Sequence, residues 1–200
     1  MEKQLIISIG REFGSGGHVI AEALAKEFGI PLFDHNLLDH IAAEKNVDHN
    51  TLRKFDEKSR NVFLSRTLKG HSSSPQDHLA QMQFDFLKRK ADKGESFVVV
   101  GRCSEQVLKE YEGMISIFIL GDKECKLKRV QEVYKLSEDE ARRKMERHDT
   151  SRKLYHNSYC KSKWGDSRSY DICVNSSRLG IEGTVEMLAD YIRARRGEKK

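Results

Sequence analysis

Five short apolar runs, separated by helical patterns, constrain the fold of this 200-residue chain more than any other feature. They lie at residues 5–9, 30–34, 96–101, 114–120 and 170–175. Each has the length of a strand, and most are rich in valine and isoleucine. The run SFVVVG is apolar on both faces, which is typical of a central strand in a parallel sheet. The alternation predicts an α/β fold in which a parallel sheet of about five strands carries helices on both faces.

The segments between these runs carry helical patterns. Residues 17–28 have apolar side chains at four-residue spacing, whereas residues 70–76, GHSSSPQ, have the composition of a loop. Further helices are expected within 36–67 and at 77–93, 122–133, 137–149 and 181–195. Residues 137–168 are charged and poor in aliphatic side chains, so we interpret them as a solvent-exposed insertion before the last strand. Ser137 and Glu140, at its start, have the spacing of a capping box.

Composition limits the range of partners. The chain has 36 Lys and Arg against 31 Asp and Glu, and its net charge of +5 suits a phosphorylated small molecule without by itself indicating nucleic acid. Its four cysteines lack C-x-x-C spacing, so we expect reduced thiols and no zinc site. No apolar window has the length of a signal peptide or a membrane span, so we expect a soluble, cytoplasmic protein without a membrane partner.

The first apolar run leads into a glycine-rich turn, GREFGSGGH at residues 10–18, which opens a helix. Ligands of open parallel sheets bind at the carboxyl ends of strands, where glycines let backbone N–H groups converge on a phosphate. The usual signature is G-x-x-x-x-G-K-[ST], and on residues 11–18 it is matched in part. Gly14 and Gly16 fit a flexible cradle. A plain strand–turn–helix corner also uses glycine, but the four glycines of this turn are more than a tight corner needs.

Three fixed positions of that signature carry other residues. Arg11 stands at the first glycine, Gly17 at the lysine, and His18 at the hydroxyl residue that normally reaches Mg²⁺. We hypothesise that Arg11 supplies the missing positive charge from the other side of the loop. As an alternative, His18 is a helix N-terminal residue without a catalytic role.

Two further charged residues follow predicted strands. Arg102 comes directly after SFVVVG, and because a guanidinium binds phosphate in bidentate fashion, a ligand role is favoured over a surface ion pair. Asp34 ends the second run, where its carboxylate could hold a sugar hydroxyl or base amino group, or act through water or metal. Capping of the following helix is an equally good explanation for Asp34.

The segment ARRKMERHDTSRKLYH, residues 141–156, is strongly basic. Arg143 and Arg147 share one helix face, and so do Asp149 and Arg152, because residues three and four apart are neighbours on a helix. A basic flap that closes over a site would neutralise a moving phosphoryl group and exclude water. Taken alone, the run is more typical of a solvated charged helix.

Together these features resemble a known family. The turn GREFGSGG, the pair Gly101-Arg102, the D-x-x-R of Asp149 and Arg152, and the tail WG…YD…NSS are similar in order and spacing to the cytidylate-kinase-like branch of the nucleoside monophosphate kinases. The resemblance covers roughly residues 4–193. The P-loop lysine and hydroxyl residue of true cytidylate kinases are absent here.

The resemblance implies a three-layer P-loop kinase-like fold in one domain, residues 1–200, with a helical acceptor-binding region at about 35–93 and a helical lid within an insertion at about 137–168. It also implies transfer of the ATP γ-phosphoryl group to CMP or dCMP, with Mg²⁺. The residues that match the donor-phosphate cradle are Gly14, Ser15, Gly16, Gly17 and His18. Those that match the acceptor contacts are Asp34, Arg102, Asp149 and Arg152, and the lid arginine is Arg143 or Arg147.

We therefore predict a phosphotransferase of the nucleoside monophosphate kinase type, whose catalytic arginines are Arg11, Arg102, Arg143 and Arg147. The alternatives are a kinase of a different small acceptor and a nucleotide-binding regulator that has lost catalysis along with the P-loop lysine. A nucleic-acid-binding module is a third hypothesis, but few aromatic residues interleave with the basic ones. Glu12 and Asp34 are both candidate ligands for magnesium. The sequence does not indicate an oligomeric state.

Overall fold

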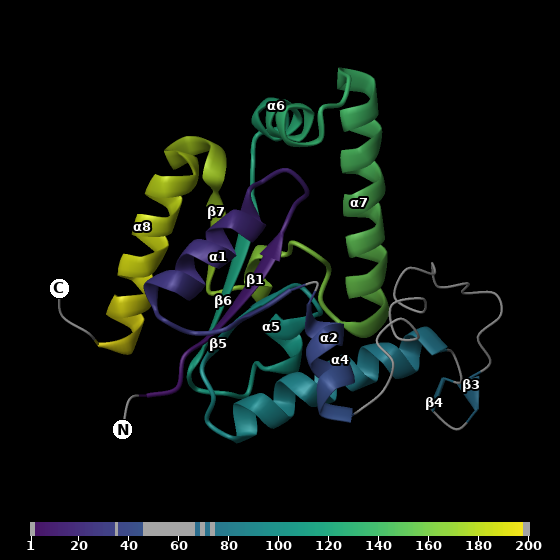
Figure 1. Ribbon diagram of the computed structural model, residues 1–200, viewed down its shortest axis with the longest axis vertical. Helices are drawn as coiled ribbons and strands as arrows, with labels where there is room; N and C mark the ends of the chain where they lie inside the picture. The colour runs from purple at the N-terminus through teal and green to yellow at the C-terminus, as the bar shows by residue number, and fades with distance from the viewer. Residues whose placement is uncertain (1–2, 35, 46–66, 69–70, 73–74, 198–200) are drawn as a thin grey trace.

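A parallel sheet forms the centre of the molecule. The computed structural model describes residues 3–34, 36–45, 67–68, 71–72 and 75–197 (Figure 1). The strands of the sheet are β1 (Ile6–Arg11), β2 (Leu32–Phe33), β5 (Phe97–Val100), β6 (Met114–Leu120) and β7 (Ile172–Asn175), in the spatial order β2-β5-β1-β6-β7. All neighbouring strands pair in parallel, with Ile6 of β1 opposite Phe97 on one side and Met114 on the other. The predicted α/β class and its five strands are confirmed.

Helices cover both faces of this sheet (Figure 1). On one face, α1 (Gly17–Glu27) and α8 (Ser176–Arg196) pack against Ile7 and Ile9 of β1. On the other face, Ile6 packs against α2 (Leu37–Lys45) and α4 (Pro75–Asp92), beside the short α5 (Ser104–Val107). Successive residues of a strand point to opposite faces, so an apolar run without polar interruptions is what a sheet covered on both sides requires.

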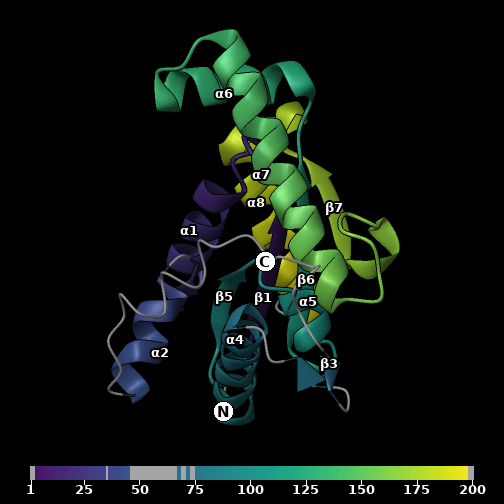
Figure 2. The ribbon, with the colours of Figure 1, turned by 90° about the vertical axis from the view of Figure 1, so that its right-hand side faces the viewer.

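Two helices stand beyond the carboxyl edge of the sheet. Helix α6 (Lys123–Tyr134) follows β6, and α7 (Glu138–Tyr159) runs along one side of the molecule (Figures 1 and 2). A small apolar cluster, which includes Phe13 of the glycine-rich turn, joins the start of α7 to α6. Most of the remaining surface of α7 is solvent-exposed or half-buried, as its charged sequence indicates.

Helix α7 confirms one local prediction and extends beyond the segment that carried it. Ser137 and Glu140 form the expected capping box, in which the Glu140 carboxylate accepts from the Ser137 backbone N–H at 2.9 Å. The helix is longer than the segment 137–149 that carries the capping-box pattern, because it continues through Asp149 and Arg152 to Tyr159. No glycine or proline interrupts residues 149–159, and a polar sequence without such breakers continues a helix once it has begun.

Other boundaries shift by smaller amounts. Helix α8 begins at Ser176 instead of residue 181, with non-helical geometry at Gly180, where φ is 70°. Pro75 and Gln76, predicted as part of a loop, open α4. The two-residue strands β3 (Thr67–Leu68) and β4 (His71–Ser72) form a separate antiparallel pair, and a single turn of 3₁₀ helix, η1 (Ser167–Ser169), precedes β7. The rest of the predicted helical region 46–66 lies outside the described residues. Among the helices that are described, none has the length and hydropathy of a membrane span.

Candidate functional site

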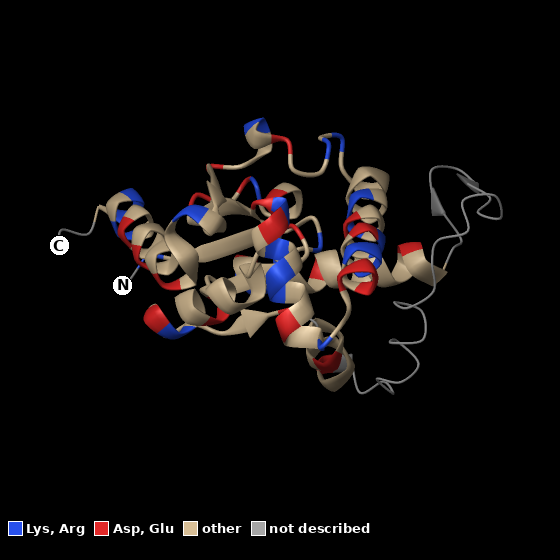
Figure 3. Ribbon diagram, turned by 90° about the horizontal axis from the view of Figure 1, so that it is seen from above, with Lys and Arg blue, Asp and Glu red and all other residues tan. Residues whose placement is uncertain are grey.

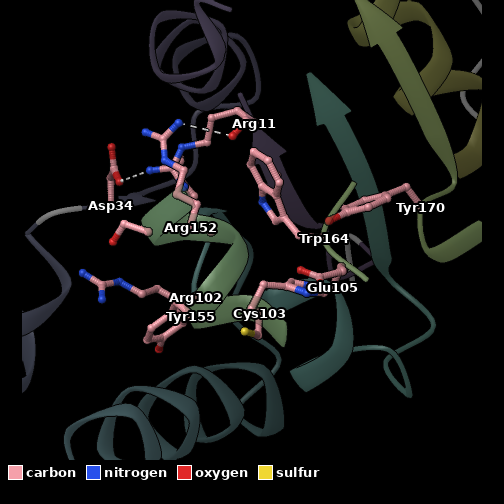
Figure 4. A pocket seen from close by; sticks show the side chains of 14 residues that line it. Arg11, Asp34, Arg102, Cys103, Glu105, Arg152, Tyr155, Trp164 and Tyr170 are labelled. Carbon is pink, nitrogen blue, oxygen red and sulfur yellow. Dashed lines mark hydrogen bonds and ion pairs between the residues drawn. The ribbon is translucent and has the colours of Figure 1, made fainter. Parts of the chain in front are cut away.

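The carboxyl ends of β1, β2 and β5 open into one cavity of about 290 Å³ (Figure 4). Arg11, the last residue of β1, lines it together with Asp34, which follows β2, and Arg102, which follows β5. Helix α7 contributes Arg152 and Tyr155. The structure therefore gathers in one cavity three arginines and a carboxylate that come from four separate parts of the sequence.

Two glycines determine where the Arg11 side chain lies. A Cβ added at Gly17 would lie 2.6 Å from Arg11 Cβ, and a Cβ added at Gly101 would overlap Arg11 Nη1. The Arg11 side chain therefore passes over the backbone of both glycines on its way into the cavity. Arg11 and Gly17, two departures from the phosphate-binding signature, are therefore in direct contact. A side chain at position 17, such as the usual lysine, would need the space that Arg11 occupies.

Charge and burial hold the Arg11 guanidinium in place. Its Nη2 lies 3.6 Å from Asp34 Oδ1, and Arg152 Nη1 donates a 3.3 Å hydrogen bond to the Arg11 carbonyl oxygen (Figure 4). Burial lowers the pKa of Arg11, and the nearby charge of Arg152 lowers it further. A guanidinium remains protonated in proteins even so, and the cavity therefore concentrates positive charge around one carboxylate. His18 Nδ1 lies 2.6 Å from Asp34 Oδ2, which places His18 beside that carboxylate.

The glycine-rich loop has the backbone shape that its sequence indicates. Gly14 and Gly16 have φ of 82° and 80°, in the left-handed region that favours glycine. A Cβ at Gly14 would lie 2.9 Å from Val130 Cγ2 of α6, and one at Gly16 would overlap Ile181 of α8. Helix α1 begins directly after this loop, and its N-cap, Gly16, makes no side-chain capping bond to the first amides. Unsatisfied amides at the start of a helix are the groups that bind phosphate.

Helix α6 supplies two cations to this loop that sequence reasoning missed. Lys126 Nζ lies 2.8 Å from Glu12 Oε2, which also accepts a 3.1 Å hydrogen bond from the Gly121 N–H. Arg129 Nη1 donates to the Gly14 carbonyl oxygen at 2.9 Å. A signal for these two residues was present in the sequence. Helix α6 follows the buried strand β6, whose carboxyl end lies at the same edge of the sheet as the loop, and Lys126 and Arg129 are three residues apart on one face of that helix.

Asp149 and Arg152 tie α7 to the same loop. Asp149 Oδ1 accepts a 2.7 Å hydrogen bond from the Phe13 backbone N–H, and Arg152 Nη1 lies 3.6 Å from that oxygen. The Arg152 guanidinium also lies 5.4 Å from the centre of the Phe13 ring. Burial raises the pKa of Asp149 and lowers that of Arg152. Of this predicted pair, Arg152 lines the cavity, while Asp149 holds the loop.

The other predicted arginines divide into two groups. Arg102 lines the cavity with φ of 58°, an uncommon value for a residue other than glycine, and its guanidinium lies 6.0 Å from the centre of the Tyr155 ring. Arg143 and Arg147 are exposed on α7 and do not line the described cavity. Figure 3, which views the molecule from above, shows Lys and Arg at positions along α7.

The opposite end of the cavity has a different character, which the sequence did not indicate. Glu105 and Tyr170 lie there, while Trp164 lies near Arg11 and Cys103 directly follows Arg102 (Figure 4). Glu105 Oε1 lies 2.7 Å from His156 Nε2, and both side chains are almost fully buried. The cavity thus combines arginines, which suit phosphate, with aromatic side chains, a thiol and the buried Glu105–His156 pair.

Comparisons with known proteins bear on the family and the fold of this chain. Residues 6–178 match the sequence model described as the cytidylate kinase-like family. A cytidylate kinase from Pyrobaculum islandicum is 23% identical over 190 residues, which cover 94% of this chain and 92% of that protein. The crystal structure of an uncharacterized protein from Eubacterium ventriosum is 41% identical, with a TM-score of 0.76, and the match covers 96% of this chain and 99% of that one.

More distant solved structures bear on the fold alone. Shikimate kinase from Acinetobacter baumannii has a TM-score of 0.56 at 12% identity, over 96% of this chain and 95% of that one. Shikimate kinase from Bacteroides thetaiotaomicron has a TM-score of 0.55 at 13% identity, over 94% of this chain and 98% of that one. Together with the parallel five-stranded sheet, these matches confirm the predicted P-loop kinase-like fold.

Proposed function

The chain belongs to the cytidylate kinase-like family, and from this premise we propose that it transfers the γ-phosphoryl group of ATP to a nucleoside monophosphate, with CMP or dCMP as the acceptor. The observation that carries the proposal is the cavity in which Arg11, Arg102 and Arg152 surround Asp34 beside the glycine-rich loop. Phosphoryl transfer needs little covalent help from a protein. Positioning and neutralisation of negative charge supply most of the catalysis, and this cavity offers both.

On the donor side, the amides of the loop and of the first turn of α1 would hold the ATP phosphates. Lys126 and Arg129 flank the loop and would add the positive charge that the absent P-loop lysine does not supply. Both candidate magnesium ligands already have partners, since Asp34 contacts Arg11 and His18 while Glu12 contacts Lys126. We favour Asp34 because its carboxylate lines the cavity. Mg²⁺ bound with ATP would neutralise charge on the terminal phosphates.

On the acceptor side, Arg102 and Arg152 would hold the monophosphate, and Tyr155 would form part of the wall beside it. We assign the acceptor region to about residues 35–93 and the lid to the insertion at about 137–168, which contains α7. In this proposal Arg143 and Arg147 are lid residues that approach the phosphates when the lid closes. Asp34, which lines the same cavity, would orient the acceptor.

A phosphoryl-transfer panel tests this function. Purified protein is mixed with Mg-ATP and one nucleoside monophosphate at a time, and the diphosphate product is detected by mass spectrometry. We expect product from CMP or dCMP, and little or none from AMP, GMP or UMP. Product from a non-nucleotide phosphate or alcohol instead would favour a kinase of another small acceptor. ATP binding without product from any acceptor would favour the catalytically impaired regulator, an alternative that the glycine at position 17 keeps open.

Replacement of Arg102 by alanine tests the acceptor site. We expect the KM for the acceptor to rise about 10- to 100-fold, because a bond from a charged donor is worth about 1.5–3 kcal/mol, while the KM for ATP changes little. Steady-state kinetics with each substrate varied in turn measures both. Arg142→Ala is the matched control, since Arg142 lies on α7 and pairs with Glu138. Full activity of Arg102→Ala toward every acceptor would refute the assignment.

A further inference from the structure

Four potential metal ligands meet where the end of α7 contacts the turn between β5 and α5. His156 and Cys160 are four residues apart at the last turn of α7, and therefore lie on one face of the helix. Cys103 is the N-cap of α5, with φ of 54°, and Glu105 lies in the first turn of that helix. Two pairs of ligands thus come from two elements that are distant in sequence.

The side-chain atoms of this cluster lie close together. Glu105 Oε1 is 2.7 Å from His156 Nε2, and the ligand atoms of Glu105, His156 and Cys160 are all within 4.8 Å of one another. Cys103, two residues before Glu105, lines the same cavity as Glu105 and His156. Ligand atoms that share one tetrahedral ion lie roughly 3.5 Å apart, given metal–ligand bonds of about 2.0–2.3 Å. Small rotations of Glu105, His156 and Cys160 would therefore bring these three onto one ion, and Cys103, which lines the same cavity, is the nearest source of a fourth ligand in the β5–α5 turn.

Burial gives the cluster a reason to hold a cation. Glu105, His156 and Cys103 are 3%, 4% and 3% exposed, and Cys160 is half-buried. Within the part of the chain that the structure describes, the Glu105 carboxylate has one hydrogen bond, to His156. An ionised carboxylate offers about four acceptor sites, and the contact with His156 uses one of them, so the others remain able to bind a metal ion. A bound dication would compensate for the desolvation of this carboxylate.

We propose that Cys103, Glu105, His156 and Cys160 form a zinc site that fastens the end of α7 to the β5–α5 turn. Two thiolates, an imidazole and a carboxylate suit Zn²⁺, whereas Mg²⁺ prefers oxygen ligands throughout. Zinc binding displaces the two thiol protons to solvent, so each cysteine binds as a thiolate. With four protein ligands the site is structural. It would fix the backbone next to Arg102 and does not depend on the proposed kinase activity.

Metal analysis of the untagged, reduced protein tests this proposal. We expect about one zinc per chain after gel filtration, and a thiolate-to-cobalt charge-transfer band in the near ultraviolet after Co²⁺ replaces zinc. Cys160→Ser and Cys103→Ser should lose most of that band and weaken zinc binding at least tenfold. Cys125→Ser, an exposed cysteine on α6, is the matched control and should retain both.

Thermal unfolding keeps the proposal testable if a variant folds poorly. A tight chelator should lower the melting temperature of the wild-type protein and leave that of Cys160→Ser unchanged, because only the former has zinc to lose. Absence of the charge-transfer band from reduced, folded wild-type protein would overturn the proposal. So would a Cys103–Cys160 disulfide in metal-free protein, identified by peptide mass spectrometry under non-reducing conditions.

Discussion

Replacement of Arg11 by alanine is expected to lower kcat about 100- to 1,000-fold, the usual cost of removing one charged or polar donor from a site where negative charge develops. Arg11 lies at the end of β1, and its side chain packs over the backbone of Gly17 and Gly101. Its guanidinium lies 3.6 Å from the Asp34 carboxylate. Its position is therefore fixed before any substrate binds. In the proposed reaction this pre-organised charge stabilises the transferring phosphoryl group, so kcat should fall more than the KM for ATP rises.

Two further variants test whether the charge or the shape of the Arg11 side chain matters, and whether the effect is specific to Arg11. Arg11→Lys retains a positive charge but not the planar, bidentate donor, so we expect its kcat to lie between those of the alanine variant and the wild type. Arg168→Ala removes an arginine whose side chain is 87% exposed and pairs with Asp166, and it should leave kcat unchanged. If Arg11→Ala turned over at the wild-type rate while its melting temperature held, Arg11 would have no catalytic role.

Local rules predicted the sheet because its strands are encoded in contiguous residues. Runs such as MISIFIL are apolar at every position, and the structure places that strand at the predicted residues 114–120. The second run was predicted at 30–34, but pairing is confined to Leu32 and Phe33, since β2 is an edge strand with a single neighbour. For helix α7 the sequence marks the start with a capping box but offers no glycine or proline to mark the end, which the structure places at Tyr159.

The candidate site was predictable to the extent that its residues lie at strand ends. Arg11, Asp34 and Arg102 directly end or follow three parallel strands, and topology alone brings such positions together. The remaining contacts depend on how helices pack at the sheet edge. Lys126 meets Glu12 across 114 residues of sequence, and His156 meets Glu105 across 51. No local pattern encodes pairs of this kind, so spacing rules for cysteine and histidine could not reveal the sulfur-containing cluster either.

Gly17→Lys, which restores the usual P-loop lysine, is expected to destabilise the protein by about 1–3 kcal/mol, the cost of overpacking a close-packed site. Gly17 is buried, and its added Cβ would lie 2.6 Å from Arg11 Cβ and 3.0 Å from Arg11 Cγ. The lysine cannot enter the site while Arg11 fills that space. We therefore expect a lower melting temperature and no gain in phosphoryl transfer from this single change.

Arg11→Gly combined with Gly17→Lys should reverse both effects. Glycine at position 11 opens the space beside residue 17, and the new lysine returns a positive charge to the loop. Because the two side chains compete for one volume, a double-mutant cycle on the free energy of unfolding should show a favourable coupling of about 1–3 kcal/mol. Phosphoryl transfer should likewise be faster in the double variant than in either single variant. His18 remains in place of the usual hydroxyl residue, so full wild-type activity is not expected.

Gly14→Ala provides the matched control for that cycle. This glycine belongs to the same loop, but its neighbours are Val130 and Lys126 of α6, so its replacement should not interact with Arg11. Combined with Arg11→Gly, it should give additive changes in stability, within about 0.5 kcal/mol. If Gly17→Lys and Arg11→Gly were equally additive, the arginine and the missing lysine would be independent substitutions. A measured coupling confined to positions 11 and 17 would show that Arg11 takes the place of the lysine that the usual signature has at position 17.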